Sequence, residues 1–102
     1  MKFWLISDNH DTLVGMRLSG IEGVLVEDKE LTAEALKKAI EDDSVGIILI
    51  TEKLSKLCPE LIDDLKLHRS KPLIVEIPDR HANGRSEGSL VRYISEAIGL
   101  KL

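Results

Sequence analysis

Four short apolar runs, separated by segments with helical periodicity, most constrain the fold of this chain. The runs are KFWLIS, GVLVE, VGIILIT and PLIVEI, at residues 2–7, 23–27, 45–51 and 72–77. Their apolar residues are nearly continuous, as in strands that are covered on both faces. Strands that alternate with helices form a parallel sheet with right-handed crossovers. The sequence therefore predicts a three-layer α/β fold, flavodoxin-like or Rossmann-like, with a four-stranded parallel sheet in the order 2-1-3-4.

The clearest helical segment is TAEALKKAIEDD, at residues 32–43. Its apolar residues repeat with the period of a helix and form one stripe. We expect the side chain of Thr32 to cap the start of this helix. The predicted stripe consists of Ala33, Leu36 and Ile40.

Three further helices are predicted. The first, at residues 11–18, is only about two turns long, and Gly20 is expected to end it in a left-handed conformation. The next lies within residues 52–69 and is interrupted by Pro59, which predicts a kink or a new start. The last is expected at residues 89–102. In the predicted strand order, the second and third helices cover one face of the sheet, and the first and last cover the other.

Length and composition indicate a single domain, residues 1–102, with one hydrophobic core. A chain of 102 residues buries about 60 to 65 % of its unfolded surface. The net charge of −4, with one Trp, one Tyr and one Phe, favours neither nucleic acid nor anionic lipid as a partner.

No run reaches the roughly 20 apolar residues that span a bilayer, and no signal peptide is predicted. The lone Cys58 cannot form an intramolecular disulfide and is expected to be a small core residue of a cytoplasmic protein.

Polar residues gather where the predicted strands end, which is the edge where open α/β sheets bind ligands. A phosphate loop is not predicted, because the chain has no GxxxxGKS and no GxGxxG after its first strand. A metal or acid–base site would lack any spaced ligand motif, and solvated strand ends are the favoured interpretation. We therefore expect no catalytic residue, metal ligand or cofactor, and we interpret residues 78–85 as a polar connector. The residues of this rejected site are Asp8, His10, Asp11 and His81.

A phospho-accepting receiver domain would share this architecture and is the main alternative, together with other small ligand-binding α/β modules. It would need carboxylates after the first strand, which Asp8 and Asp11 supply. It would also need an acceptor Asp after the third strand, where Thr51 and Glu52 stand, and a fifth strand with a lysine. The sequence lacks both of these features.

The segment SLVRYISEAIGLKL, at residues 89–102, is predicted to be a helix with an unusually wide apolar surface. At 100° per residue, its apolar side chains cover an arc of about 200°, roughly twice an ordinary stripe. A helix of another protein is the simplest binding partner for such a surface. Which flank of the arc faces the partner is left open. The proposed partner-binding residues are Leu90, Val91, Tyr93, Ala97, Leu100 and Leu102, with Arg17 on the short first helix.

Five segments, through their order and spacing, carry a resemblance to a known family. They are GMRLSGIEG (15–23), IILITEKL (47–54), LCPELID (57–63), LIVEIP (73–78) and YISEAIGLKL (93–102). Together they resemble the F subunit of the V-type and A-type rotary ATPases, over nearly the whole chain. No single motif is diagnostic. Met16 and Ser19 are mild departures, because the family usually has an aromatic residue and often Ala at these positions.

The resemblance implies a non-catalytic subunit of the central stalk, or rotor. It implies binding to the coiled-coil D subunit and, through it, to the A/B catalytic head, which carries the nucleotide sites. It also implies a place in the V1/A1 sector, cytoplasmic and peripheral to the membrane, in a complex that couples ATP synthesis or hydrolysis to ion transport. Proton or sodium coupling, the direction of the reaction, and an activating or inhibitory role stay open.

Overall fold

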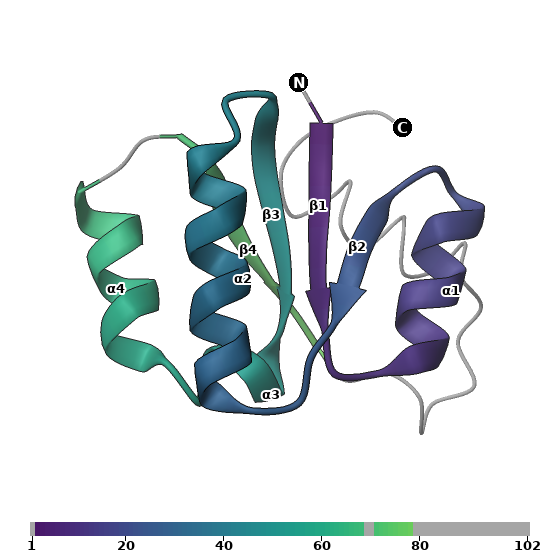
Figure 1. Cartoon of the computed structure of the whole chain (residues 1–102), viewed down its shortest axis with the longest axis horizontal. Helices are drawn as coiled ribbons and strands as arrows, with labels where there is room; N and C mark the ends of the chain where they lie inside the picture. The colour runs from purple at the N-terminus through teal and green to yellow at the C-terminus, as the bar shows by residue number, and fades with distance from the viewer. Residues whose placement is uncertain (1, 69–70, 79–102) are drawn as a thin grey trace.

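Four parallel strands form one sheet in the order β2-β1-β3-β4 (Figure 1). They are β1 (Lys2–Ser7), β2 (Glu22–Leu25), β3 (Val45–Thr51) and β4 (Leu73–Ile77). The structure, a computed structural model, describes residues 2–68 and 71–78. The predicted α/β class and strand order are confirmed.

Burial of the strands follows from their places in the sheet. All seven residues of β3 are buried, because this strand has a neighbour on each side and apolar contacts on both faces. The edge strand β2 has only half-buried and exposed residues. It is also shorter than predicted, since Val26 and Glu27 already belong to the loop that leads into the next helix.

The helices are α1 (His10–Leu18), α2 (Lys29–Glu41), α3 (Glu52–Ser55) and α4 (Pro59–His68). The new start predicted at Pro59 is confirmed, because α4 begins at this residue. The predicted helix at residues 89–102 lies outside the described residues, and so does its expected place on the sheet.

Helices lie on both faces of the sheet (Figure 1). Residues of α2 and α4 pack with Ile6, Ile48 and Ile50 on one face, whereas residues of α1 pack with Leu5 and Leu49 on the other. Alternation along the strands explains this division, because successive side chains point to opposite faces. The two faces therefore have separate apolar clusters, with β3 contributing to both.

The start of α2 differs from the prediction. The helix begins three residues earlier than expected, and its N-cap is Asp28, whose Oδ1 accepts a 2.7 Å hydrogen bond from the backbone N–H of Leu31. Thr32 is instead fully buried, and its hydroxyl donates to the backbone oxygen of Asp28 at 2.7 Å. The expected cap at Thr32 is thus wrong. The buried stripe is rotated as well, since Ala35, Leu36 and Ala39 are buried while Ala33 and Ile40 are only partly so.

The turn after α1 depends on Gly20, which has a φ of +88°. Its N–H donates to the backbone oxygen of Arg17 at 3.0 Å, and the N–H of Ile21 donates to that of Met16 at 2.9 Å. These bonds satisfy carbonyl groups at the end of the helix, as a left-handed glycine after a helix commonly does. The predicted left-handed turn at Gly20 is confirmed.

Candidate functional site

The carboxyl ends of β1 and β3 are joined by a side-chain hydrogen bond at the predicted ligand-binding edge. The hydroxyl of Thr51 donates to Oδ1 of Asp8 at 2.7 Å, and Nζ of Lys53 lies 3.8 Å from Oδ2 of Asp8. The side chain of Asp8 is 17 % exposed. The sequence suggested that Asp8 is a solvated strand end. Its carboxylate is instead largely buried, accepts a hydrogen bond from Thr51 and lies near the ammonium group of Lys53.

The loop between β1 and α1 also satisfies its own polar groups. The N–H of Asn9 donates to Oγ of Ser7 at 2.9 Å, and the Ser7 hydroxyl donates to the backbone oxygen of Asn9 at 3.0 Å. Oδ1 of Asn9 accepts from the N–H of Thr12 at 3.0 Å and thereby caps α1. These side chains order the loop and start the helix.

This edge lacks the acceptor that a receiver domain would need. Thr51 stands at the end of β3, and its hydroxyl already donates to Asp8. A carboxylate at position 51 could not donate in this way, and two adjacent carboxylates would repel each other. The arrangement fits a structural tie between two strands better than a site of phosphoryl transfer.

The residues of the rejected metal site do not converge in the described part of the chain. The side chains of His10 and Asp11 are 74 % and 92 % exposed and lie 4.0 Å apart. His81 lies outside the described residues. Among residues 2–68 and 71–78, no three side chains of His, Cys, Asp or Glu come together as a metal site would require.

Cys58 is buried at the start of α4. Its Sγ lies 3.6 Å from the backbone oxygen of Lys29, at the first residue of α2. The thiol thus occupies a small space between two helices, as expected for a small core residue.

The outer surface of α1 carries an apolar pair beside the predicted partner-binding residue Arg17. Val14 and Leu18 are four residues apart on this helix, and they are 38 % and 78 % exposed. Arg17 is exposed as well and lines a groove at the amino-terminal edge of β1 and β2. A cation next to exposed aliphatic side chains is typical of a surface that binds another protein.

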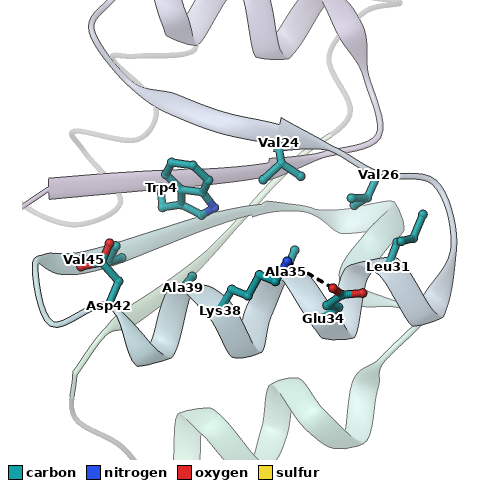
Figure 2. Close-up of a pocket in the computed structure, with 10 residues that line it drawn as sticks. All are labelled: Trp4, Val24, Val26, Leu31, Glu34, Ala35, Lys38, Ala39, Asp42 and Val45. Atoms are coloured by element: carbon teal, nitrogen blue, oxygen red, sulfur yellow. Dashed lines mark ion pairs between the residues drawn. The ribbon is translucent and has the colours of Figure 1, made fainter.

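A second groove, which the sequence analysis did not identify, lies between α2 and the strands β1 and β2 (Figure 2). It has a volume of about 410 Å³. Trp4 comes from β1, Val24 from β2, and Leu31 from the first turns of α2. Leu31 is the residue that could have indicated this groove from the sequence, because it is an apolar residue just before the predicted helix and does not belong to the predicted stripe.

The other partner-binding residues are not among those that the structure describes. They are Leu90, Val91, Tyr93, Ala97, Leu100 and Leu102. Within residues 2–68 and 71–78, no helix has the length and apolar character needed to cross a bilayer.

Comparison with known proteins agrees with the resemblance seen in the sequence. Residues 4–94 match the family described as ATP synthase (F/14-kDa) subunit. The F subunit of the A-type ATP synthase of Thermococcus kodakarensis is 37 % identical over 107 aligned positions, which cover 100 % of this chain and 98 % of that protein. The F subunits of the A-type enzymes of Pyrococcus furiosus and Methanocaldococcus jannaschii are 35 % and 31 % identical, with 100 % of this chain and at least 98 % of each relative covered. The chain therefore belongs to the family of ATP synthase F subunits.

Proposed function

We propose that this protein is a non-catalytic central-stalk subunit of an A/V-type ATP synthase and that it binds the coiled-coil D subunit of the rotor. Family membership is the observation that carries the proposal. Through the D subunit, the protein would be attached to the A/B catalytic head and would turn with the stalk, peripheral to the membrane. It would support ATP synthesis or hydrolysis without contacting nucleotide itself.

The contact is assigned to the last helix, residues 89–102, and to the exposed surface of α1. On α1, the aliphatic pair Val14 and Leu18 supplies apolar area, and the guanidinium of Arg17 supplies a charge that a flanking carboxylate of the coiled coil can pair with. Exposed apolar side chains beside a charged rim are a common form of protein–protein contact.

Association with the coiled-coil partner tests the function directly. The full chain, co-expressed with the coiled-coil subunit of its own complex, should elute as a one-to-one complex, and the purified pair should not hydrolyse ATP. Incubation of the isolated protein with a small-molecule phospho-donor should leave its intact mass unchanged. Absence of a complex, together with a phosphoryl group gained on an aspartate, would favour the receiver alternative.

Single charges test the assigned surfaces. Arg17→Glu and Leu18→Glu should weaken binding without lowering the melting temperature, whereas Lys56→Glu, the same charge reversal at an exposed position after α3, should bind normally. On the last helix, Tyr93→Glu and Leu102→Glu test its two flanks. Normal binding by both α1 variants would exclude α1 from the interface but leave the function intact.

A further inference from the structure

Among the described residues, α2 lies mainly over β1 and β3 and leaves β2 only partly covered on this face. α1 packs against β1 and β2, whereas α2 packs against β1 and β3, and α4 against β4. The crossover explains this placement, because α2 leads from β2 past β1 to β3. Within residues 2–68 and 71–78, the main helix contact of β2 is therefore with α1, on one face, while Val24 on the other face stays only partly buried.

The groove between β2 and α2 lies at this place (Figure 2). Val24 of β2 and Trp4 of β1 form its floor, and both are only partly buried. On the α2 wall, Leu31, Ala35 and Ala39 follow one another at intervals of four residues and so share one side of the helix. The ion pair of Lys38 and Glu34, with 3.2 Å between Nζ and Oε1, lines the same wall (Figure 2). The groove thus has an apolar floor and an apolar row on the α2 wall, with one ion pair beside that row.

The dimensions of the groove suit an α-helix. From Leu31 to Asp42, the α2 wall is about 16 Å long, or about three turns. Two of its apolar residues are alanines, and small side chains let a second helix approach to the interaxial distance of about 8–10 Å found between packed helices. A helix in this position would lie beside α2 and would cover β2.

Exposed apolar residues also lie near the β2 edge outside the groove. Leu25 of β2 is 42 % exposed, and Val14 and Leu18 of α1, the helix on the other face of this strand, are 38 % and 78 % exposed. Exposed apolar side chains therefore occur on both sides of β2, in the groove and on the surface of α1 that the proposed function assigns to the stalk.

The charges around Leu31 indicate which kind of helix fits. Residues 27–34 carry four exposed carboxylates, on Glu27, Asp28, Glu30 and Glu34, against one exposed ammonium, on Lys29. Within the described chain, neither Glu27 nor Glu30 forms an ion pair. A helix with basic residues beside its apolar stripe would complement this end of the groove.

We propose that the groove between β2 and α2 binds one amphipathic helix of the coiled-coil stalk subunit. The apolar stripe of that helix lies on Trp4, Val24 and Leu31, and its basic residues lie beside Glu27 and Glu30. This inference rests on the proposed function and adds a second contact surface to it, on the opposite face of the sheet from α1.

Two other occupants fit the groove less well. A symmetric contact with a second copy of the chain would place residues 27–34 of both copies together, and like charges oppose such a contact. The predicted helix at residues 89–102 is expected on the α1 face, where the short α1 leaves sheet to cover.

Leu31→Lys tests the groove, because it removes the apolar anchor and repels a basic partner. Leu31 is about half exposed, so the variant should keep the melting temperature of the wild type. Its affinity for the coiled-coil subunit should fall by about tenfold or more. Leu67→Lys, the same change at a 78 % exposed position on α4, is the matched control and should bind as the wild type does. Glu30→Lys should weaken binding as well, and most strongly at low salt.

A photo-crosslinking residue at position 31 of the full chain supplies a second measurement that does not depend on affinity. It should crosslink to the stalk subunit, whereas the same residue at position 67 should not. Normal binding by Leu31→Lys, with no crosslink from position 31, overturns the groove proposal and leaves the proposed function standing. Absence of binding by the wild-type chain overturns the proposed function itself. A crosslink from position 31 to residues 89–102, or to a second copy of the isolated chain, overturns the assigned occupant.

Discussion

The hydroxyl of Thr51 donates a 2.7 Å hydrogen bond to Oδ1 of Asp8, across 43 residues of sequence. The two residues stand at the carboxyl ends of β3 and β1, the neighbouring strands between which an open α/β sheet of this order changes direction. Many such sheets bind a ligand at this point. Here the two side chains satisfy each other, so the position stabilises the sheet.

Replacement of Asp8 by Ala should therefore destabilise the fold. Thr51 is only 3 % exposed, and the loss of its acceptor leaves a buried hydroxyl without this partner, at a cost of about 1–3 kcal/mol. Asp8→Asn keeps an acceptor oxygen and should cost less. Urea unfolding measures both changes. Asp11→Ala is the control, because its carboxylate is 92 % exposed, and it should change stability by less than about 0.5 kcal/mol. Equal stability of the Asp8 and Asp11 variants would contradict the structural role of the bond.

The fold was predictable because its signals are local and repeated. Continuous apolar runs identify buried strands wherever they occur, and Pro59 and Gly20 act through their own backbones, so the α4 start and the turn after α1 could be placed. The bond between Asp8 and Thr51 could not be placed. It depends on the register of two strands far apart in sequence, and neither residue alone predicts it.

The groove could not be predicted for a related reason. Trp4 and Val24 belong to apolar runs that indicate buried strands, and only the path of α2 over β1 and β3 leaves them partly uncovered. The exposure of an edge strand thus depends on how the chain connects the strands and helices. It cannot be read from the apolar pattern of the strand itself.

Asp42 should make stability depend on pH in the acid range. Its carboxylate accepts hydrogen bonds from Oγ of Ser44 at 2.6 Å and from the Ser44 N–H at 2.9 Å, and lies 3.2 Å from Nζ of Lys2. These contacts lower the pKa of Asp42 from 3.8 to about 2, with the Ser44 hydroxyl as the largest cause. A lowered pKa stabilises the fold above the unfolded value, and this stabilisation is lost as the pH falls through the folded value.

The stability of the wild type should thus decline more steeply than that of Asp42→Asn as the pH falls from 3.8 towards about 2. Ser44→Ala removes the hydroxyl but keeps the backbone bond, so its decline should be intermediate. Urea midpoints of the three proteins, measured over this range, make the comparison, since other carboxylates titrate equally in all three. Parallel curves for the wild type and Asp42→Asn would show that these contacts do not stabilise the carboxylate.

Gly20→Val should lower the melting temperature through the backbone alone. The φ of +88° is unfavourable for residues with a side chain, at a cost of about 1 kcal/mol or more, and a Cβ here would meet no atom within 4 Å. Gly20→Ala should cost about as much as Gly20→Val, whereas Gly20→Asn should cost less because Asn tolerates this conformation. Thermal melts compare the three. A loss for Val far above that for Ala would point to a steric cause instead.

Gly23→Ala should destabilise the protein for that steric reason. A Cβ at this position in β2 would lie 2.6 Å from the Cβ of Leu5 and would also overlap the backbone oxygen of Leu5 on the neighbouring strand. We expect a loss of about 1–3 kcal/mol, typical of overpacking. Combination with Leu5→Ala should not restore the loss, because both the Cβ and the backbone oxygen of residue 5 stay in place. Rescue in the double variant would show that the side-chain atoms of Leu5 beyond Cβ were the obstacle.

Two replacements at the start of α2 distinguish the cap that the structure contains from the cap that the sequence suggested. Asp28→Ala removes the acceptor for the N–H of Leu31 and should cost about 1 kcal/mol, because the first turn then has an unsatisfied donor. Thr32→Val keeps the shape of a fully buried side chain and removes only its hydroxyl. The oxygen that accepts from this hydroxyl, on Asp28, also accepts the helical N–H of Thr32 at 3.0 Å, so it keeps a partner. Thr32→Val should therefore cost less than Asp28→Ala.

Both Thr and Asp are favoured at helix starts, so propensity alone does not decide between them. The decisive difference is burial. Thr32 is fully buried, whereas Asp28 lies at the surface, where a carboxylate stays hydrated and interacts with the positive end of the helix dipole. Asp28→Asn keeps the capping oxygen without the charge and separates these two contributions. Chemical unfolding at neutral pH measures the set, and a larger loss for Thr32→Val than for Asp28→Ala would place the start of α2 back at Thr32.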